Sequence, residues 1–125
     1  MVRDWEQLLH VLEDIERERV IDRLTSIDEA DEDLYCGHLL LAEDAGLIEG
    51  LHVRRLEDGS WGYDREAYPR LTFAGHDMLD ALRSSKVWRE VKRTASELMV
   101  PISMELIKHT LTSMLSQQAP RFKRG

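Results

Sequence analysis

Apolar side chains recur three and four residues apart in the first part of the chain, which is the period of an amphipathic helix. A first helix is expected from Asp4 to Glu18, with Asp4 as its N-cap. Its apolar face leaves the carboxylates, Asp14 among them, on the solvated side. Residues 20–27 fit either a short helix or a short strand, and the sequence leaves both alternatives open.

A longer helix is expected from about Ala30 to Ala45, behind an acidic cluster that suits a helix N-terminus. Gly46 is expected to end it in the left-handed conformation, with Leu47 supplying the apolar contact after the stop. The predicted inner face carries Leu34, His38, Leu41, Ala42 and Ala45, with Tyr35 and Leu39 beside it.

Beyond Gly46 the pattern changes from helical spacing to apolar and polar alternation. Two alternating runs, residues 47–56 and 59–71, are separated by a turn that contains Asp58-Gly59. This dipeptide is typical of a tight hairpin turn. The sequence therefore predicts a two-stranded hairpin.

Helical spacing then returns in three segments. Thr72 is expected to cap a helix over 73–83, whose predicted buried positions are Phe73, Leu79 and Leu82. The second helix is expected over 86–98. The third is expected over 102–117, where Pro101 suits the first turn.

This order of elements predicts an α+β fold, mostly α, of the winged helix-turn-helix type with a two-stranded wing. The winged-helix-like domain is assigned to residues 1–84, and two C-terminal helices to residues 85–118. A basic tail follows at residues 119–125.

Charge is unevenly distributed along the chain. The net charge is −7, and residues 1–50 hold 4 Lys/Arg against 15 Asp/Glu. A nucleic acid is therefore expected to meet the second half of the chain. The single cysteine, Cys36, excludes an internal disulfide, and no segment resembles a signal peptide or a membrane span. These features predict a cytoplasmic protein that does not associate with membranes.

Candidate binding residues gather in the hairpin, where arginines alternate with aromatic side chains. Such a surface can contact phosphates or stack on bases. The alternative is that these arginines pair with the acidic first half. A helix that recognises bases in the DNA major groove needs basic or amide side chains in its N-terminal half. In the helix expected from about Ala30 to Ala45, that half is acidic. The candidate nucleic-acid-binding residues are Arg54, Arg55, Arg65, Arg70, Trp61 and Tyr63.

Several other residues are expected to have structural roles and no part in catalysis or metal binding. Gly46, His76 and Asp80 are assigned structural roles, because a His-Asp pair four residues apart is a weak metal site without further ligands. No nucleophile, phosphate-loop or metalloprotease motif is present, so neither enzyme activity nor a cofactor or metal is expected. An apolar stripe on the last helix is a candidate dimer or partner interface, or packs on the core: Met104, Ile107, Leu111 and Met114.

Two segments carry a family resemblance, His38–Gly50 and Arg70–Arg83. Together with Val87-Trp88 they resemble the domain of unknown function 2513 family, found mostly in phages, prophages and their bacterial hosts. Phe73 stands where that family commonly has Trp, and Met78 where it commonly has Phe. The resemblance implies a winged-helix-like fold and no proven activity. The matching residues in the second segment are Leu71, Thr72, Gly75, His76, Asp77, Leu79, Asp80, Ala81 and Arg83.

Two functional hypotheses follow, both for a non-enzymatic binding protein. In the first, the chain is a phage-associated transcriptional regulator that contacts double-stranded DNA through the wing, as a homodimer. In the second, it is an adaptor or inhibitor that has the winged-helix shape but binds a protein partner with a basic surface. Fold analogy favours the first hypothesis, whereas the acidic charge favours the second.

Overall fold

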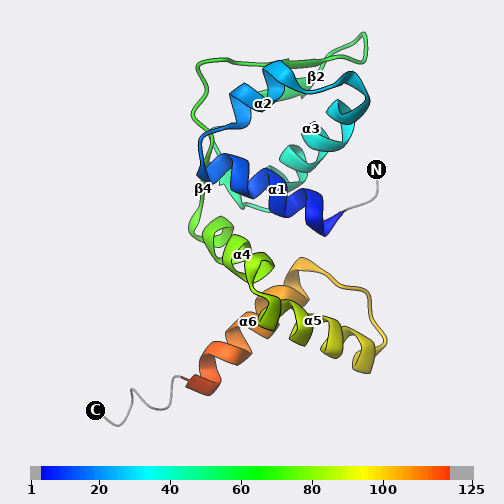
Figure 1. The fold of residues 1–125 in the computed structure, drawn as a ribbon, viewed down its shortest axis with the longest axis vertical. Helices are drawn as coiled ribbons and strands as arrows, with labels where there is room; N and C mark the ends of the chain where they lie inside the picture. Colours follow the sequence, from blue (N-terminus) through cyan, green and yellow to red (C-terminus); the bar gives the residue numbers. More distant parts are fainter. Residues whose placement is uncertain (1–3, 119–125) are drawn as a thin grey trace, which may run out of the picture. The chain divides into compact units, whose positions relative to one another are not determined.

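The computed structural model describes residues 4–118, so the expected basic tail at 119–125 lies outside the described residues. It is an α+β protein, mostly helical (Figure 1). The chain divides into two compact units between Leu79 and Asp80, inside helix α4. Within the described part, no helix is long and apolar enough to cross a membrane.

Three helices open the first unit: α1 (Trp5–Glu16), α2 (Val20–Ser26) and α3 (Glu29–Asp44). The ambiguous segment is therefore helical. The Asp4 carboxylate caps α1 as expected, because it accepts hydrogen bonds from the backbone N–H groups of Glu6 and Gln7. α1 packs against both α2 and α3.

The buried face of α3 differs from the expected one. Leu34 is 40% exposed, and Leu41 and Ala45 are only half-buried. The difference is a rotation of the helix about its axis, which turns the Tyr35 hydroxyl towards Asp14 in α1. The side chains that α3 buries are Tyr35, Cys36, His38, Leu39 and Ala42.

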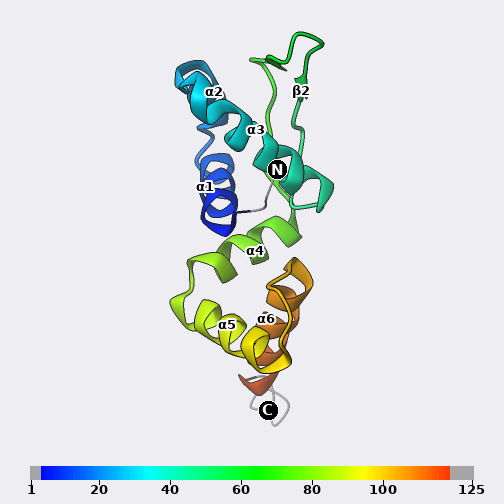
Figure 2. The ribbon, with the colours of Figure 1, turned by 90° about the vertical axis from the view of Figure 1, so that its right-hand side faces the viewer.

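An antiparallel ribbon follows α3 and has two ladders. β1 (Ile48–Glu49) pairs with β4 (Arg70–Leu71), and β2 (Val53–Arg55) pairs with β3 (Trp61–Tyr63). The turn at the tip has Gly59 at φ +86°, a conformation that favours glycine. In Figure 2, α3 lies between the α1–α2 pair and this ribbon. The expected hairpin is confirmed.

A backbone junction joins the end of α3 to the start of α4 (Phe73–Arg83). Gly46 has the expected left-handed φ of +74°, and Leu47 is fully buried. The Thr72 hydroxyl donates to the Gly46 carbonyl at 2.6 Å and accepts from the Gly75 N–H at 3.0 Å. The Thr72 N–H donates to the Leu47 carbonyl at 3.0 Å. One threonine therefore caps α4 and fixes it to the α3 stop.

Two expectations for the later helices were wrong. Phe73 is 92% exposed, because the inner face of α4 is formed by Met78, Leu79 and Ala81. The last helix, α6 (Met104–Gln118), begins after Pro101, because the Ser103 hydroxyl caps it by accepting from the Leu106 N–H at 3.1 Å.

The second unit is built around α5 (Ser85–Leu98), which packs on α6. Ser84 caps α5, since its hydroxyl accepts from the Val87 N–H at 3.2 Å. The buried side chains of these two helices are mostly small or β-branched: Val87, Val91, Ala95, Ile107 and Thr110.

Candidate functional site

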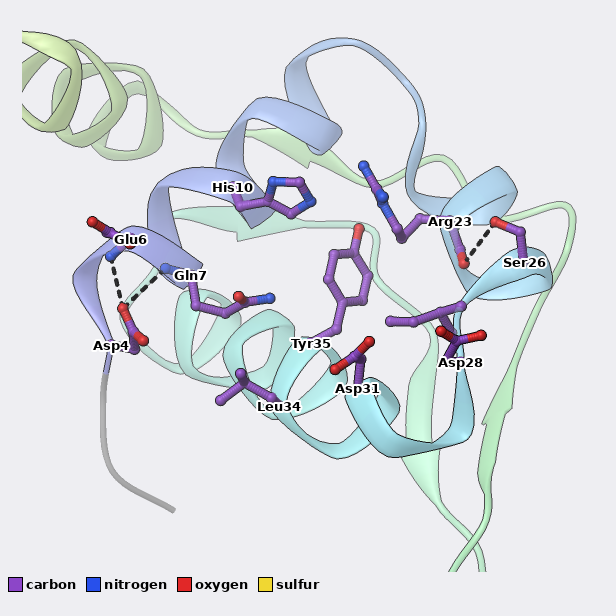
Figure 3. Close-up of a pocket in the computed structure, with 11 residues that line it drawn as sticks. Asp4, Glu6, Gln7, His10, Arg23, Ser26, Asp28, Asp31, Leu34 and Tyr35 are labelled. Carbon is purple, nitrogen blue, oxygen red and sulfur yellow. Dashed lines mark hydrogen bonds between the residues drawn. The ribbon is translucent and has the colours of Figure 1, made fainter.

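A cleft of about 500 Å³ opens among the first three helices (Figure 3). α1 contributes Glu6 and His10, α2 contributes Arg23, and the start of α3 contributes Asp31. Apolar side chains, the half-exposed Leu34 among them, complete the wall. The cleft therefore combines a polar rim with an apolar patch.

Carboxylates dominate the rim of this cleft. Asp4 and Glu6 lie at the start of α1, and Asp28 and Asp31 at the start of α3. Asp4 is engaged in capping its helix. Glu6, Asp28 and Asp31 are exposed, and among residues 4–118 none of them forms an ion pair. Three carboxylates are thus available to a cationic ligand.

His38 connects the start of α1 to the middle of α3. Its ring is fully buried, Nδ1 lies 2.8 Å from the Leu34 carbonyl, and Nε2 accepts from the Asp4 N–H at 2.9 Å. These partners assign the proton to Nδ1 and require a neutral ring. His38 thereby fixes the acidic N-cap of α1 against α3, which is a positioning role.

A buried carboxylate accepts hydrogen bonds from two side chains that line the cleft. Asp14 is 5% exposed and accepts from the Tyr35 hydroxyl at 2.8 Å and from Arg23 Nε at 3.1 Å. His10 Nε2 lies 3.6 Å from the same carboxylate. The hydrogen bond to Asp14 raises the pKa of Arg23. Asp14 was expected on the solvated side of its helix, and that expectation was wrong.

Sequence reasoning missed this network. The available signal was that Asp14 follows Val11 by three residues and therefore lies on the apolar face of α1. Its partners come from other helices at separations of 9 and 21 residues. The sequence does not specify such contacts.

The free energy of unfolding is expected to fall as pH rises above about 9. Burial raises the pKa of the Cys36 thiol from 9.0 to about 12. Burial and the hydrogen bond to Asp14 raise the pKa of Tyr35 above its ordinary 10.0. Both groups stay protonated in the folded chain while they ionise in the unfolded one. Each therefore lowers stability by up to about 1.4 kcal/mol per pH unit above its unfolded pKa.

Urea denaturation between about pH 7.5 and 11 measures this effect. Cys36→Ala should lose the part of the decline that begins near pH 9. A denaturation free energy that stays constant up to pH 11 would contradict the assignment of both protonated groups.

The hairpin binds α3 through one aromatic side chain and one arginine. Trp61 Nε1 donates to Asp33 Oδ1 at 2.8 Å, and Arg55 Nη1 lies 3.4 Å from the same oxygen. The Arg55 guanidinium also lies over the Trp61 ring, 5.2 Å from its centroid. The Trp61 hydrogen bond, followed by the Arg55 charge, lowers the pKa of Asp33. The side chains of Arg55 and Trp61 are therefore already in contact with Asp33.

The remaining hairpin candidates are divided. Arg70 forms an ion pair with Glu49, its ladder partner. Arg54 and Arg65 are exposed, and neither has an ion-pair partner in the described part of the chain. Tyr63 is half-buried opposite Val53. In the described part of the chain, two of the four candidate arginines are therefore engaged in ion pairs and two are available to a ligand.

The other candidate residues have separate environments. His76 and Asp80 are both exposed on α4, and residues 4–118 contain no group of three or more His, Cys, Asp or Glu placed to hold a metal ion.

On α6, Ile107 is fully buried within the single chain, whereas Met104, Leu111 and Met114 are half-buried. The α6 stripe therefore exposes less apolar surface to a partner than the sequence predicts.

Comparison with known proteins identifies the family. The model of DUF2513, described as "Hypothetical protein (DUF2513)", matches residues 2–100. The chain therefore belongs to the DUF2513 family. It is also similar to a protein of Haemophilus influenzae (strain ATCC 51907 / DSM 11121 / KW20 / Rd) described as "Uncharacterized protein". The two are 27% identical over 123 residues, which cover 94% of this chain and 98% of the relative. No solved structure matches the chain.

Proposed function

We propose that this member of the DUF2513 family is a non-enzymatic protein-binding module that captures a basic segment of its partner in the cleft among α1, α2 and α3. The order of α1–α3 and the ribbon supports a winged-helix-like first unit, with α3 in the place of the recognition helix and β2–β3 as the wing. The association with phages remains a prediction that rests on the family resemblance alone.

One observation carries the proposal: the carboxylates at the start of α3 are divided between the cleft and the contact with the hairpin. Asp28 and Asp31 line the cleft, whereas Asp33 is held by the wing. DNA approaching α3 would meet negative charge on both surfaces. An arginine or lysine would instead find carboxylates on the rim and an apolar patch for its aliphatic stem at Leu34.

The cleft can be tested with a labelled nonapeptide of alternating arginine and leucine. The wild-type chain is expected to bind it at physiological salt, and Asp28→Asn with Asp31→Asn is expected to weaken binding by about tenfold or more. The matched control, Glu43→Gln with Asp44→Asn, removes the same charge from the exposed C-terminal end of the same helix. Equal losses in the two double variants would mean that only the net charge matters, and would contradict a cleft site.

The second candidate function is contact with double-stranded DNA through the wing. Arg54 and Arg65, both exposed and without an ion-pair partner among residues 4–118, favour it. Two free arginines support only a few phosphate contacts, whose affinity falls steeply with salt. Duplex DNA of mixed sequence is therefore the competing ligand in the same titration.

A further inference from the structure

Two aromatic side chains are exposed on either side of β4. Tyr68, just before the strand, is 80% exposed, and Phe73, just after it, is 92% exposed. Phe73 also borders a hollow that it shares with Arg70 and His76. Large aromatic side chains on a soluble surface are typical of binding hot spots.

A pocket with a mixed polar and apolar lining lies beside Tyr68. It has a volume of about 220 Å³, and its inner wall is formed by Ile15 and Val20, both buried. Tyr68 belongs to its lining, while Glu18 and Arg65 supply its charges. The pocket is therefore a recess with an apolar inner wall and one charge of each sign.

We propose that two copies of the chain form a symmetric dimer in which Phe73 of each copy enters this pocket of the other. The segment 67–73 contains both the pocket wall, from Ala67 to Pro69, and the exposed aromatic ring. A two-fold interface requires each copy to carry both complementary features, and segment 67–73 carries the ring and part of the pocket wall.

The charges around these features also favour a second copy. Glu18 accompanies Arg65 at the pocket, and Glu49 accompanies Arg70 next to Phe73. A surface with alternating signs matches another copy of itself. A nucleic acid would instead require a predominantly basic surface.

Sedimentation equilibrium of the full chain from about 5 to about 500 μM tests the proposal. The wild type is expected to dimerise, and Phe73→Ser is expected to raise the dissociation constant by about tenfold or more. Because Phe73 is exposed, this change should leave the thermal melt unchanged at a concentration where both chains are monomeric. The control Leu115→Ser removes another exposed apolar side chain (58% exposed), on α6. A wild type that is monomeric throughout, or equal effects of the two variants, would overturn the proposal.

A disulfide placed across the interface tests its geometry. Phe73→Cys and Ala67→Cys, made in separate chains and mixed under oxidising conditions, should form a mixed dimer, while buried Cys36 stays unreactive. A dimer that forms without this cross-link would overturn the placement of Phe73 in the pocket. Asp28→Asn with Asp31→Asn should dimerise like the wild type, so the failure of this proposal is distinguishable from failure of the cleft.

Discussion

Gly75→Ala is expected to destabilise the chain by about 3 kcal/mol or more, although alanine is the better helix former by about 1 kcal/mol. Gly75 is buried in α4. A methyl group there would overlap the Leu47 carbonyl oxygen and lie 2.9 Å from the carbonyl carbon. That carbonyl accepts the Thr72 N–H, so the backbone cannot move away without breaking the junction of α3 and α4.

Thermal and urea denaturation followed by circular dichroism measure this effect. The control is Gly59→Ala at the tip of the hairpin, where φ is +86° but a methyl group meets nothing within 4 Å. Its expected cost is about 1 kcal/mol, from backbone strain alone. A Gly75→Ala chain that melts at or above the wild-type temperature would show that α4 does not pack against Leu47 as described.

Asp14→Ala is expected to lower the free energy of unfolding by about 3 kcal/mol. The substitution leaves the buried Tyr35 hydroxyl and one side of the Arg23 guanidinium without their acceptor. Removing both partners of the buried hydrogen bond should cost less than the sum of the single changes. Tyr35→Phe alone is therefore expected to cost only about 1 kcal/mol, and the double variant to be less than additive.

A double-mutant cycle of Asp14 and Tyr35 in urea denaturation measures this coupling. Asp44→Ala, which removes an exposed carboxylate from the end of α3, should change stability by less than about 0.5 kcal/mol. If the two single changes add without coupling, Tyr35 and Asp14 do not interact in the folded chain.

Local patterns predicted much of the fold because they depend on neighbouring residues. The Asp4 cap, the left-handed Gly46, the turn at Gly59 and the Thr72 cap are set by side chains within a few positions of each backbone group. The hairpin was predictable for the same reason. Phe73 was misplaced because apolar character alone does not decide which side of a helix faces the core.

The candidate site was less predictable, because it depends on how helices rotate about their axes. The acidic start of α3 was evident from the sequence, whereas the division of its carboxylates between the cleft and the β2–β3 hairpin was not. Arg55 was predicted as a binding residue, and the alternative that it pairs with the acidic half describes its actual contact with Asp33. Charge composition indicated that such pairs would form, but three-dimensional packing determined which ones.

The most direct test offers the wild-type chain both ligands in one anisotropy titration at physiological salt: the arginine–leucine nonapeptide and a mixed-sequence DNA duplex. We expect saturable peptide binding that depends on Asp28 and Asp31, and no measurable binding of the duplex. Duplex binding that survives at this salt concentration, together with peptide binding that is indifferent to those two carboxylates, would contradict this expectation and assign the function to the wing.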